Sequence, residues 1–218
     1  KTPIEDVDRS NLNDIDYVLY GNIGINQSEE LNRLATKGVY FLDGHDLYGN
    51  APRTIEYEGE NVIGIQKLPT FKRELVEYHG KAYPIGFGIP ENQIRPIDFD
   101  IKKQLYQKTA PDDSLFQEIT DLGGSRNHHK FTVEEDYYND LSSSWFGLTC
   151  KKGGWDCLRH YEILAAGSLL LFKDYDKKPP LCSPIGLPCF SYSTPEELND
   201  LMARLVVDNK PTEEYNEM

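Results

Sequence analysis

The sequence predicts an α/β fold with two parallel sheets, and three observations lead to this prediction. Short apolar runs alternate with amphipathic helical patterns from about residue 16 onward. The runs are apolar without a break, which is typical of parallel strands covered on both faces. A Pro- and Gly-rich stretch, residues 83–100, then interrupts the alternation. Because this stretch exceeds an ordinary turn, it predicts a connection between two α/β halves.

The first half contains three predicted strands, at residues 16–23, 39–46 and 61–68. Between the first two, residues 28–38 predict a helix that begins at a serine cap and ends at a glycine. These segments form a predicted βαβ unit. Residues 70–80 predict a short helix with Thr70 as its N-cap.

The second half continues the alternation with strands predicted at residues 103–110, 128–133, 145–149 and 168–172. Helices are predicted at residues 114–124 and 134–144, between Asp156 and Gly167, and at residues 194–208. Asp156 is the expected cap of the third helix, and Thr194 the cap of the last, with Pro195 in its first turn. We expect an N-terminal domain over residues 1–95 and a C-terminal domain over residues 96–218.

Charge and composition narrow the range of partners. The 218 residues include 23 basic and 36 acidic side chains, for a formal net charge of -13. This charge repels phosphate backbones and anionic lipid, so we expect neither nucleic acid nor membrane as a partner. No apolar run is long enough to cross a bilayer, and no apolar leader is evident, which predicts a cytoplasmic location. Because the first residue is Lys1, neighbouring domains of a longer polypeptide are also expected partners.

The four cysteines occur as two pairs, each with six residues between the partners. Cysteine pairs in structural zinc sites usually have two to four residues between them, so the spacing here favours free thiols and no bound metal.

A basic, glycine-containing loop precedes the third helix of the second half. Two lysines and then Gly153 and Gly154 allow backbone N–H groups to approach a ligand at the positive end of the helix dipole, which suits a diphosphate. Arg159 and Glu162 share a face near the helix start, and a carboxylate there can accept hydrogen bonds from a ribose diol. The alternative is a plain surface ion pair between Arg159 and Glu162.

The stretch FGLTCKKGGWDCLRHYEILAAGSLLLF, residues 146–172, resembles the nucleotide-sugar-binding signature of GT-B glycosyltransferases. The likeness is to group 1 and exostosin-like enzymes, where an R-x-x-E-x-x-A-x-G pattern precedes a buried strand. Residues 71–75, 84–90 and 194–205 are similar to landmarks in compact members of this group. The resemblance implies two facing Rossmann-like domains with parallel sheets, with the donor bound to the second and the acceptor entering from the first.

The same resemblance implies roles for individual residues. Glu162 would bind ribose hydroxyls, Arg159 and the loop Lys152, Gly153 and Gly154 the diphosphate, and Trp155 would form a wall of the donor pocket. The sequence departs from the wider family in its size, about a hundred residues per half. It also lacks a glutamate seven residues before Glu162, where Trp155 stands. That departure argues against a retaining mechanism and favours an inverting one.

Residues 151–167 also resemble glycosyltransferase domains inside multi-domain chlorella-virus enzymes that decorate the capsid protein. This resemblance implies transfer of a deoxyhexose such as L-rhamnose from a UDP-linked donor to a glycan or glycoprotein acceptor, in the host cytoplasm. No cofactor or metal is expected beyond the nucleoside diphosphate sugar itself.

Inverting transfer needs a general base for the acceptor hydroxyl. The strand tip DGHD offers Asp43, His45 and Asp46 at the carboxyl end of a predicted strand, where ligands approach parallel sheets. Asp43 or Asp46 is the preferred base, and His45 is an alternative. The other interpretation is that the two aspartates only shape a turn.

Two basic residues of the first half are further candidates for donor binding. Lys72 and Arg73 are placed to neutralise phosphate charge across the cleft. Arg73 has an alternative partner in Glu77, four residues further along the predicted helix.

Three other kinds of function are compared with the residues of the chain. The D-x-D patterns at residues 98–100 and 174–176 are typical of metal-dependent GT-A glycosyltransferases. His128 and His129 lie on a predicted strand and point to opposite sides, which argues against a double-histidine metal site. A non-catalytic module that binds a sugar or a nucleotide would keep the donor pocket without the base. An oxidoreductase or epimerase needs a G-x-G-x-x-G turn that residues 20–27 do not supply.

Overall fold

The computed structural model describes residues 18–21, 39–44, 56–57, 60–61, 69–76, 81–108 and 131–217. Its contacts divide the chain into two compact units, Lys1–Ile85 and Gly86–Met218. The division lies inside the Pro- and Gly-rich stretch that the sequence predicts as a connection. The domains expected at residues 1–95 and 96–218 stay a prediction.

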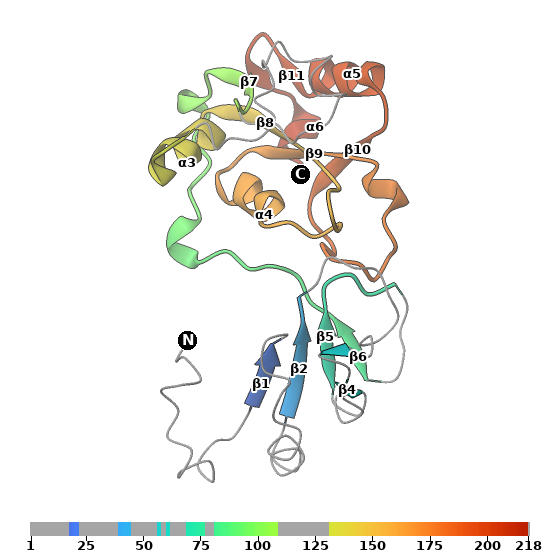
Figure 1. Ribbon diagram of the computed structural model, residues 1–218. Coiled ribbons are helices and arrows are strands. Elements are labelled where there is room, and N and C mark those ends of the chain that lie inside the picture. Colours follow the sequence, from blue (N-terminus) through green and yellow to red (C-terminus); the bar gives the residue numbers. More distant parts are fainter. Residues whose placement is uncertain are drawn as a thin grey trace. The chain divides into compact units, whose positions relative to one another are not determined.

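The first unit contains a four-stranded sheet in which all strands are parallel and follow one another in chain order (Figure 1). Its strands are β1 (Val18–Gly21), β2 (Val39–Asp43), β5 (Thr70–Lys72) and β6 (Ala82–Pro84). A separate antiparallel pair joins β3 (Glu56–Tyr57) to β4 (Glu60–Asn61). The parallel pairing of β1 with β2 confirms the two strands predicted at residues 16–23 and 39–46.

The helix predicted at residues 70–80 is wrong at its start, because β5 occupies Thr70–Lys72. The Phe71 ring lies between two strands, with its centroid 5.9 Å from that of Tyr40 and 6.0 Å from that of Tyr83. The pairing of β5 with a strand on each side therefore outweighs the helical pattern of its own sequence. The predicted helix at residues 28–38 lies outside the described residues, as does all but Asn61 of the strand predicted at residues 61–68.

The second unit contains another parallel four-stranded sheet, in the order β10-β9-β8-β7. Its strands are β7 (Gln104–Tyr106), β8 (Ser144–Cys150), β9 (Leu169–Lys173) and β10 (Cys189–Tyr192). Its helices are α3 (Glu134–Ser142), α4 (Leu158–Ala165), α5 (Pro195–Leu205) and α6 (Glu213–Asn216). Short 3-10 turns at Glu91–Gln93, Phe99–Ile101 and Tyr175–Lys177 and a small hairpin of β11 (Val206–Val207) and β12 (Lys210–Pro211) complete it.

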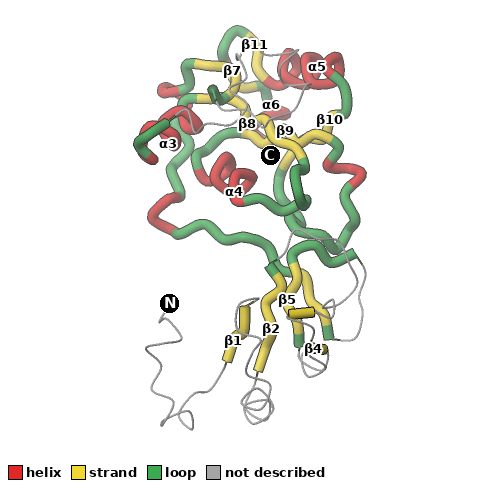
Figure 2. The backbone as a smooth tube through the Cα atoms, in the orientation of Figure 1, coloured by secondary structure: helices red, strands yellow, loops and turns green. Residues whose placement is uncertain are grey.

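Helices cover the second sheet on both faces, as its uninterrupted apolar strands predict. Alternation along β8 sends Phe146 and Leu148 into a core that is completed by α5 and α6. Gly147 and Thr149 face the opposite side, where α4 packs on β8 and β9. Figure 2 shows α4 and α5 as separate helices beside the yellow strands. The fold is therefore mixed α/β with parallel sheets, compatible with a Rossmann-like fold.

The sequence correctly predicts the start of α5 and the end of α4. Thr194 caps α5 by accepting a hydrogen bond from the Glu197 amide, with Pro195 at the first turn, as predicted. Gly167 ends α4 with a φ of 73°, and the amides of Gly167 and Ser168 donate to Leu164 and Ile163 in a Schellman arrangement.

Two local predictions in this unit are wrong. Asp156 does not cap α4, because the cap residue is Cys157 and no side chain serves there. The strand predicted at residues 128–133 is not formed over residues 131–133, which lead into α3 as coil. The helix predicted at residues 114–124 lies outside the described residues. None of the described helices is long and apolar enough to cross a membrane.

Candidate functional site

The candidate site of the second unit lies at the carboxyl edge of its sheet, where β8 leads into α4. Lys152 and Gly153 are exposed in the connecting loop, and the Lys152 amide donates to the Gly154 carbonyl at 3.2 Å. No side chain caps α4. The His160 amide donates to the Cys157 carbonyl at 3.1 Å, and among the described residues the two helix amides before it have no acceptor. Gly153 and Gly154 thus stand where the sequence predicts a loop for an anion.

Basic side chains follow two neighbouring strand ends at this edge. Cys150 of β8 is paired in register with Lys173 of β9, so the two strands end at the same level. Lys151 and Lys152 follow the first strand, and Lys173 ends the second. Lys173 was not recognised in the sequence, because only the strand register brings it beside the loop.

Trp155 lies beneath the loop, with 6% of its surface exposed. Its ring centroid is 6.1 Å from that of Phe172, and the Lys151 ammonium lies 5.5 Å from the Trp155 centroid. The indole therefore supports the loop from the core side and keeps the Lys151 ammonium close to its face.

The Glu162 carboxylate is held by two tyrosines of α3. Tyr137 Oη donates to one carboxylate oxygen at 2.9 Å, and Tyr138 Oη to the other at 3.3 Å. Burial, followed by the Glu162 charge, raises the pKa of Tyr137 well above its usual range and that of Tyr138 to about 12. Both hydroxyls therefore stay protonated and donate at neutral pH. Among the described ion pairs, none joins Arg159 to Glu162.

Tyr137 and Tyr138 are not among the site residues that the sequence predicts. The available signal was a pair of tyrosines in a predicted helix directly before the strand that leads to the loop. The contact itself depends on the packing of α3 against α4.

Asp156 braces the start of α4 instead of capping it. Its buried carboxylate accepts a hydrogen bond from Tyr161 Oη at 2.9 Å and another from the Phe87 amide at 3.2 Å. The Phe87 and Tyr161 rings meet edge to face, with centroids 6.5 Å apart. Phe87 thus fixes the position of the loop and the helix start from a distant part of the chain.

His160 links α4 to β8 from inside the unit. Its Nε2 lies 3.0 Å from the Trp155 carbonyl and its Nδ1 3.0 Å from Thr149 Oγ1. Because a carbonyl only accepts, Nε2 carries the hydrogen and Nδ1 accepts from the threonine hydroxyl. Burial lowers the pKa of His160 to about 4, so the ring is neutral in the folded protein.

We expect His160 to make folding stability depend on pH. Between pH 6.5 and about 4 the unfolded chain binds a proton at this ring and the folded chain does not, so stability is lost as the pH falls. The loss between pH 7 and pH 5 should be about 2 kcal/mol. Urea unfolding of wild type and His160→Gln at both pH values measures it. An equal pH dependence in the two proteins would contradict the buried neutral ring.

In the first unit, Asp43 and Lys72 form a buried ion pair. They are register partners at the ends of β2 and β5, and Lys72 Nζ lies 2.7 Å from Asp43 Oδ2. The Arg73 amide also bonds the Asp43 carbonyl. Two residues predicted for different roles, base and phosphate ligand, thus contact each other. His45 and Asp46, the other base candidates, and Glu77, the alternative partner of Arg73, lie outside the described residues.

The carboxylates of the two D-x-D patterns have local partners. Asp98 accepts from the Asp100 amide within its own turn. Asp174 accepts from Lys177 and Ser193, and Asp176 from Ser191. The described residues include no group of three or more metal-binding side chains. His128 and His129 lie outside them, and all four cysteines have free thiols.

No protein-family model matches this chain, and no curated protein matches it.

Proposed function

We propose that the second unit binds a nucleoside diphosphate sugar and that the chain is a glycosyltransferase acting on a glycan or glycoprotein acceptor. The observation that carries the proposal is the arrangement on α4. Gly153 is exposed in the loop before α4, and the helix start, which no side chain caps, stands one turn before a carboxylate that two tyrosines orient. The sequence resemblance to GT-B enzymes supplies the reaction class and the two facing domains.

The diphosphate would lie at the carboxyl edge of the second sheet. The loop amides, the start of α4 and the ammonium groups of Lys151, Lys152 and Lys173 all favour negative charge there. Arg159, on the first turn of α4, adds a planar donor suited to phosphate oxygens. Binding by these groups requires no metal ion.

The ribose would be held by Glu162. An ionised carboxylate offers about four acceptor sites, and the two tyrosines occupy two of them. The remaining sites can accept both hydroxyls of a ribose diol. Tyr137 and Tyr138 then act as positioning residues that fix the carboxylate before the donor arrives.

For the chemical step, we assign the general base to the end of β2. Asp43 or Asp46 would take the acceptor proton, with His45 as the alternative. Because Asp43 Oδ2 contacts Lys72, that contact has to open, or the other carboxylate oxygen has to accept the proton. An inverting course, a UDP donor and a deoxyhexose such as L-rhamnose complete the proposal.

The ribose assignment is tested by comparing UDP with 2′-deoxy-UDP. Glu162→Gln should weaken UDP binding about tenfold or more, because hydrogen bonds to a charged acceptor are lost. The same variant should weaken 2′-deoxy-UDP binding less, because that ligand has one hydroxyl fewer to lose. Calorimetric titration of both ligands gives the four affinities.

Glu196→Gln is the matched control, since Glu196 is an exposed residue of α5. It should bind UDP as the wild type does. A folded Glu162→Gln protein with wild-type affinity for UDP would refute the role of Glu162. Nucleotide binding without any hydrolysis or transfer would instead identify a non-catalytic binding module.

A further inference from the structure

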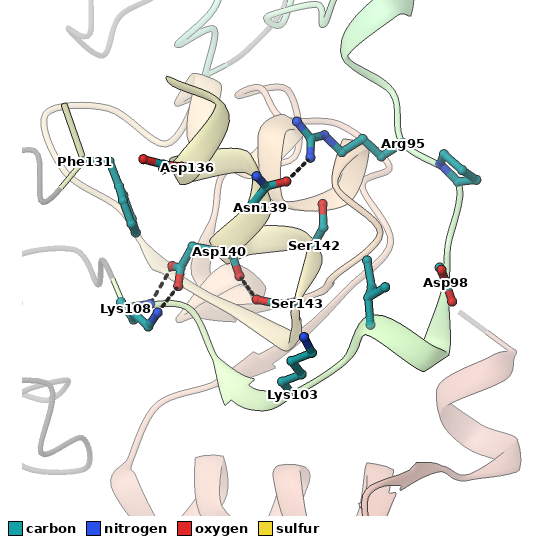
Figure 3. A pocket seen from close by; sticks show the side chains of 12 residues that line it. Arg95, Asp98, Lys103, Lys108, Phe131, Asp136, Asn139, Asp140, Ser142 and Ser143 are labelled. Atoms are coloured by element: carbon teal, nitrogen blue, oxygen red, sulfur yellow. Dashed lines mark hydrogen bonds and ion pairs between the residues drawn. The ribbon is translucent and has the colours of Figure 1, made fainter. Parts of the chain in front are cut away.

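A hollow in the same unit, drawn in Figure 3, lies at the amino ends of the strands, whereas the glycine loop lies at their carboxyl ends. Its volume is about 790 Å³, within the range of small-molecule sites. Lys103 and Ser143, which line it, directly precede β7 and β8, whereas the glycine loop follows the end of β8. The seven residues of β8 span about 20 Å, so the two places are distinct.

Charges of both signs line this hollow and balance one another. Its lining includes three cations and three carboxylates: Arg95, Lys103, Lys108, Asp98, Asp136 and Asp140. A phosphate or another strong anion would meet the carboxylates, and a cation would meet the basic groups. The balance favours a neutral polar ligand.

Some of these groups are already engaged inside the protein. Arg95 donates to Asn139 Oδ1 and to both carboxylate oxygens of Glu135. Asp140 accepts from the Gln104 amide group and from the Lys108 backbone amide. These contacts hold the Arg95 and Asp140 side chains in place.

Other groups are left for a ligand. Within the described part of the chain, no hydrogen bond occupies the Lys103 ammonium, the Asp136 carboxylate or Asn139 Nδ2. Ser142, 5% exposed, also lines the hollow, and its hydroxyl has no partner there. Figure 3 shows these four residues around the opening together with Phe131. Among the described residues, donors and an acceptor thus line one hollow without internal partners.

Phe131 adds an aromatic surface to these polar groups. Its ring is half-buried against Tyr137, with centroids 6.3 Å apart, and it also lines the hollow. A sugar ring has an apolar C–H face and a rim of hydroxyls that both donate and accept. An aromatic ring beside unpaired donors and a carboxylate matches both features.

We propose that this hollow is a binding site for a neutral oligosaccharide, separate from the donor site. Phe131 would carry the C–H face of one sugar ring, and Asp136, Asn139 and Lys103 would bind hydroxyls along the oligosaccharide. The inference does not need the proposed function. If the chain is a glycosyltransferase and the hollow binds an oligosaccharide, that oligosaccharide is a part of the acceptor glycan that lies far from the reacting hydroxyl.

The test is a calorimetric titration of the whole chain with maltotriose, cellotriose, mannotriose, xylotriose and N,N′,N″-triacetylchitotriose. At least one should bind, and Asp136→Ala and Phe131→Ala should each weaken that binding at least tenfold. Phe131→Tyr should retain it, which separates an aromatic contact from a folding defect. Asp200→Ala, a change at an exposed residue of α5, is the matched control and should bind as the wild type does.

UDP is titrated into the same variants to distinguish effects on the hollow from effects on the donor site. Its affinity should be unchanged in all of them, so failure at one site does not imply failure at the other. Absence of binding for every trisaccharide overturns the proposal, as does binding that the Asp136 and Phe131 variants leave intact. Binding of inorganic phosphate that Lys103→Ala abolishes, with no trisaccharide bound, would assign the hollow to an anion and also overturn it.

Discussion

Replacing Gly147 by alanine should destabilise the second unit by about 2–3 kcal/mol, as expected for overpacking of a close-packed interior. A Cβ atom at this position would lie 2.1 Å from Ile163 Cγ2, and two further atoms of Ile163 would lie within 2.8 Å. Ile163 is completely buried between α4 and β8. Relief of the clash requires either a strained Ile163 rotamer or a movement of α4, and with it Arg159 and Glu162, away from the sheet.

Urea unfolding followed by tryptophan fluorescence measures this effect. Both tryptophans of the chain, Trp145 and Trp155, belong to the second unit, so the signal reports on that unit. Gly88→Ala is the control, because a Cβ there meets no atom within 4 Å. The double variant Gly147→Ala with Ile163→Ala should lose less stability than the sum of the single variants. Strict additivity would contradict the close approach of α4 to β8.

Replacing Lys72 by methionine should destabilise the first unit by about 3–5 kcal/mol, the usual effect of breaking a buried ion pair. The substitution removes the ammonium group that contacts the Asp43 carboxylate, which is buried, with 5% of the residue exposed. The double variant Asp43→Leu with Lys72→Met should recover most of the loss, because both charges are then absent.

Far-UV circular dichroism during urea unfolding measures this change, and tryptophan fluorescence should stay as in the wild type because the first unit has no tryptophan. Lys81→Met, at an exposed lysine of the same unit, is the control. Loss of sugar transfer in Asp43→Asn protein that is still folded under the assay conditions would support Asp43 as the base. An unchanged unfolding curve for Lys72→Met would show that the pair contributes little to the fold.

Local chemistry predicted much of the second unit. Thr194 followed by Pro195 placed the start of α5, and Gly167 placed the end of α4, because caps depend on residues close in sequence. Thr70 was misassigned for the opposite reason. Its strand exists because two neighbouring strands pair with it, and that pairing has no local signal.

The candidate site likewise combines residues that local sequence predicts with residues that only the fold brings together. The glycine loop and Glu162 could be located from the pattern alone, since they lie on one continuous stretch. The tyrosines that hold Glu162, the Phe87 amide that holds Asp156 and the lysine at the end of β9 come from other elements. Only the packing of α3, α4 and the sheet brings them to the same place.

The most direct test of the central claim is a calorimetric titration of the wild-type chain with UDP and GDP, first in EDTA and then with manganese. We expect micromolar binding of one nucleotide that does not change when the metal is added. Binding that requires manganese would contradict a metal-independent diphosphate site at Gly153 and Gly154. No binding at millimolar nucleotide would refute the donor site itself.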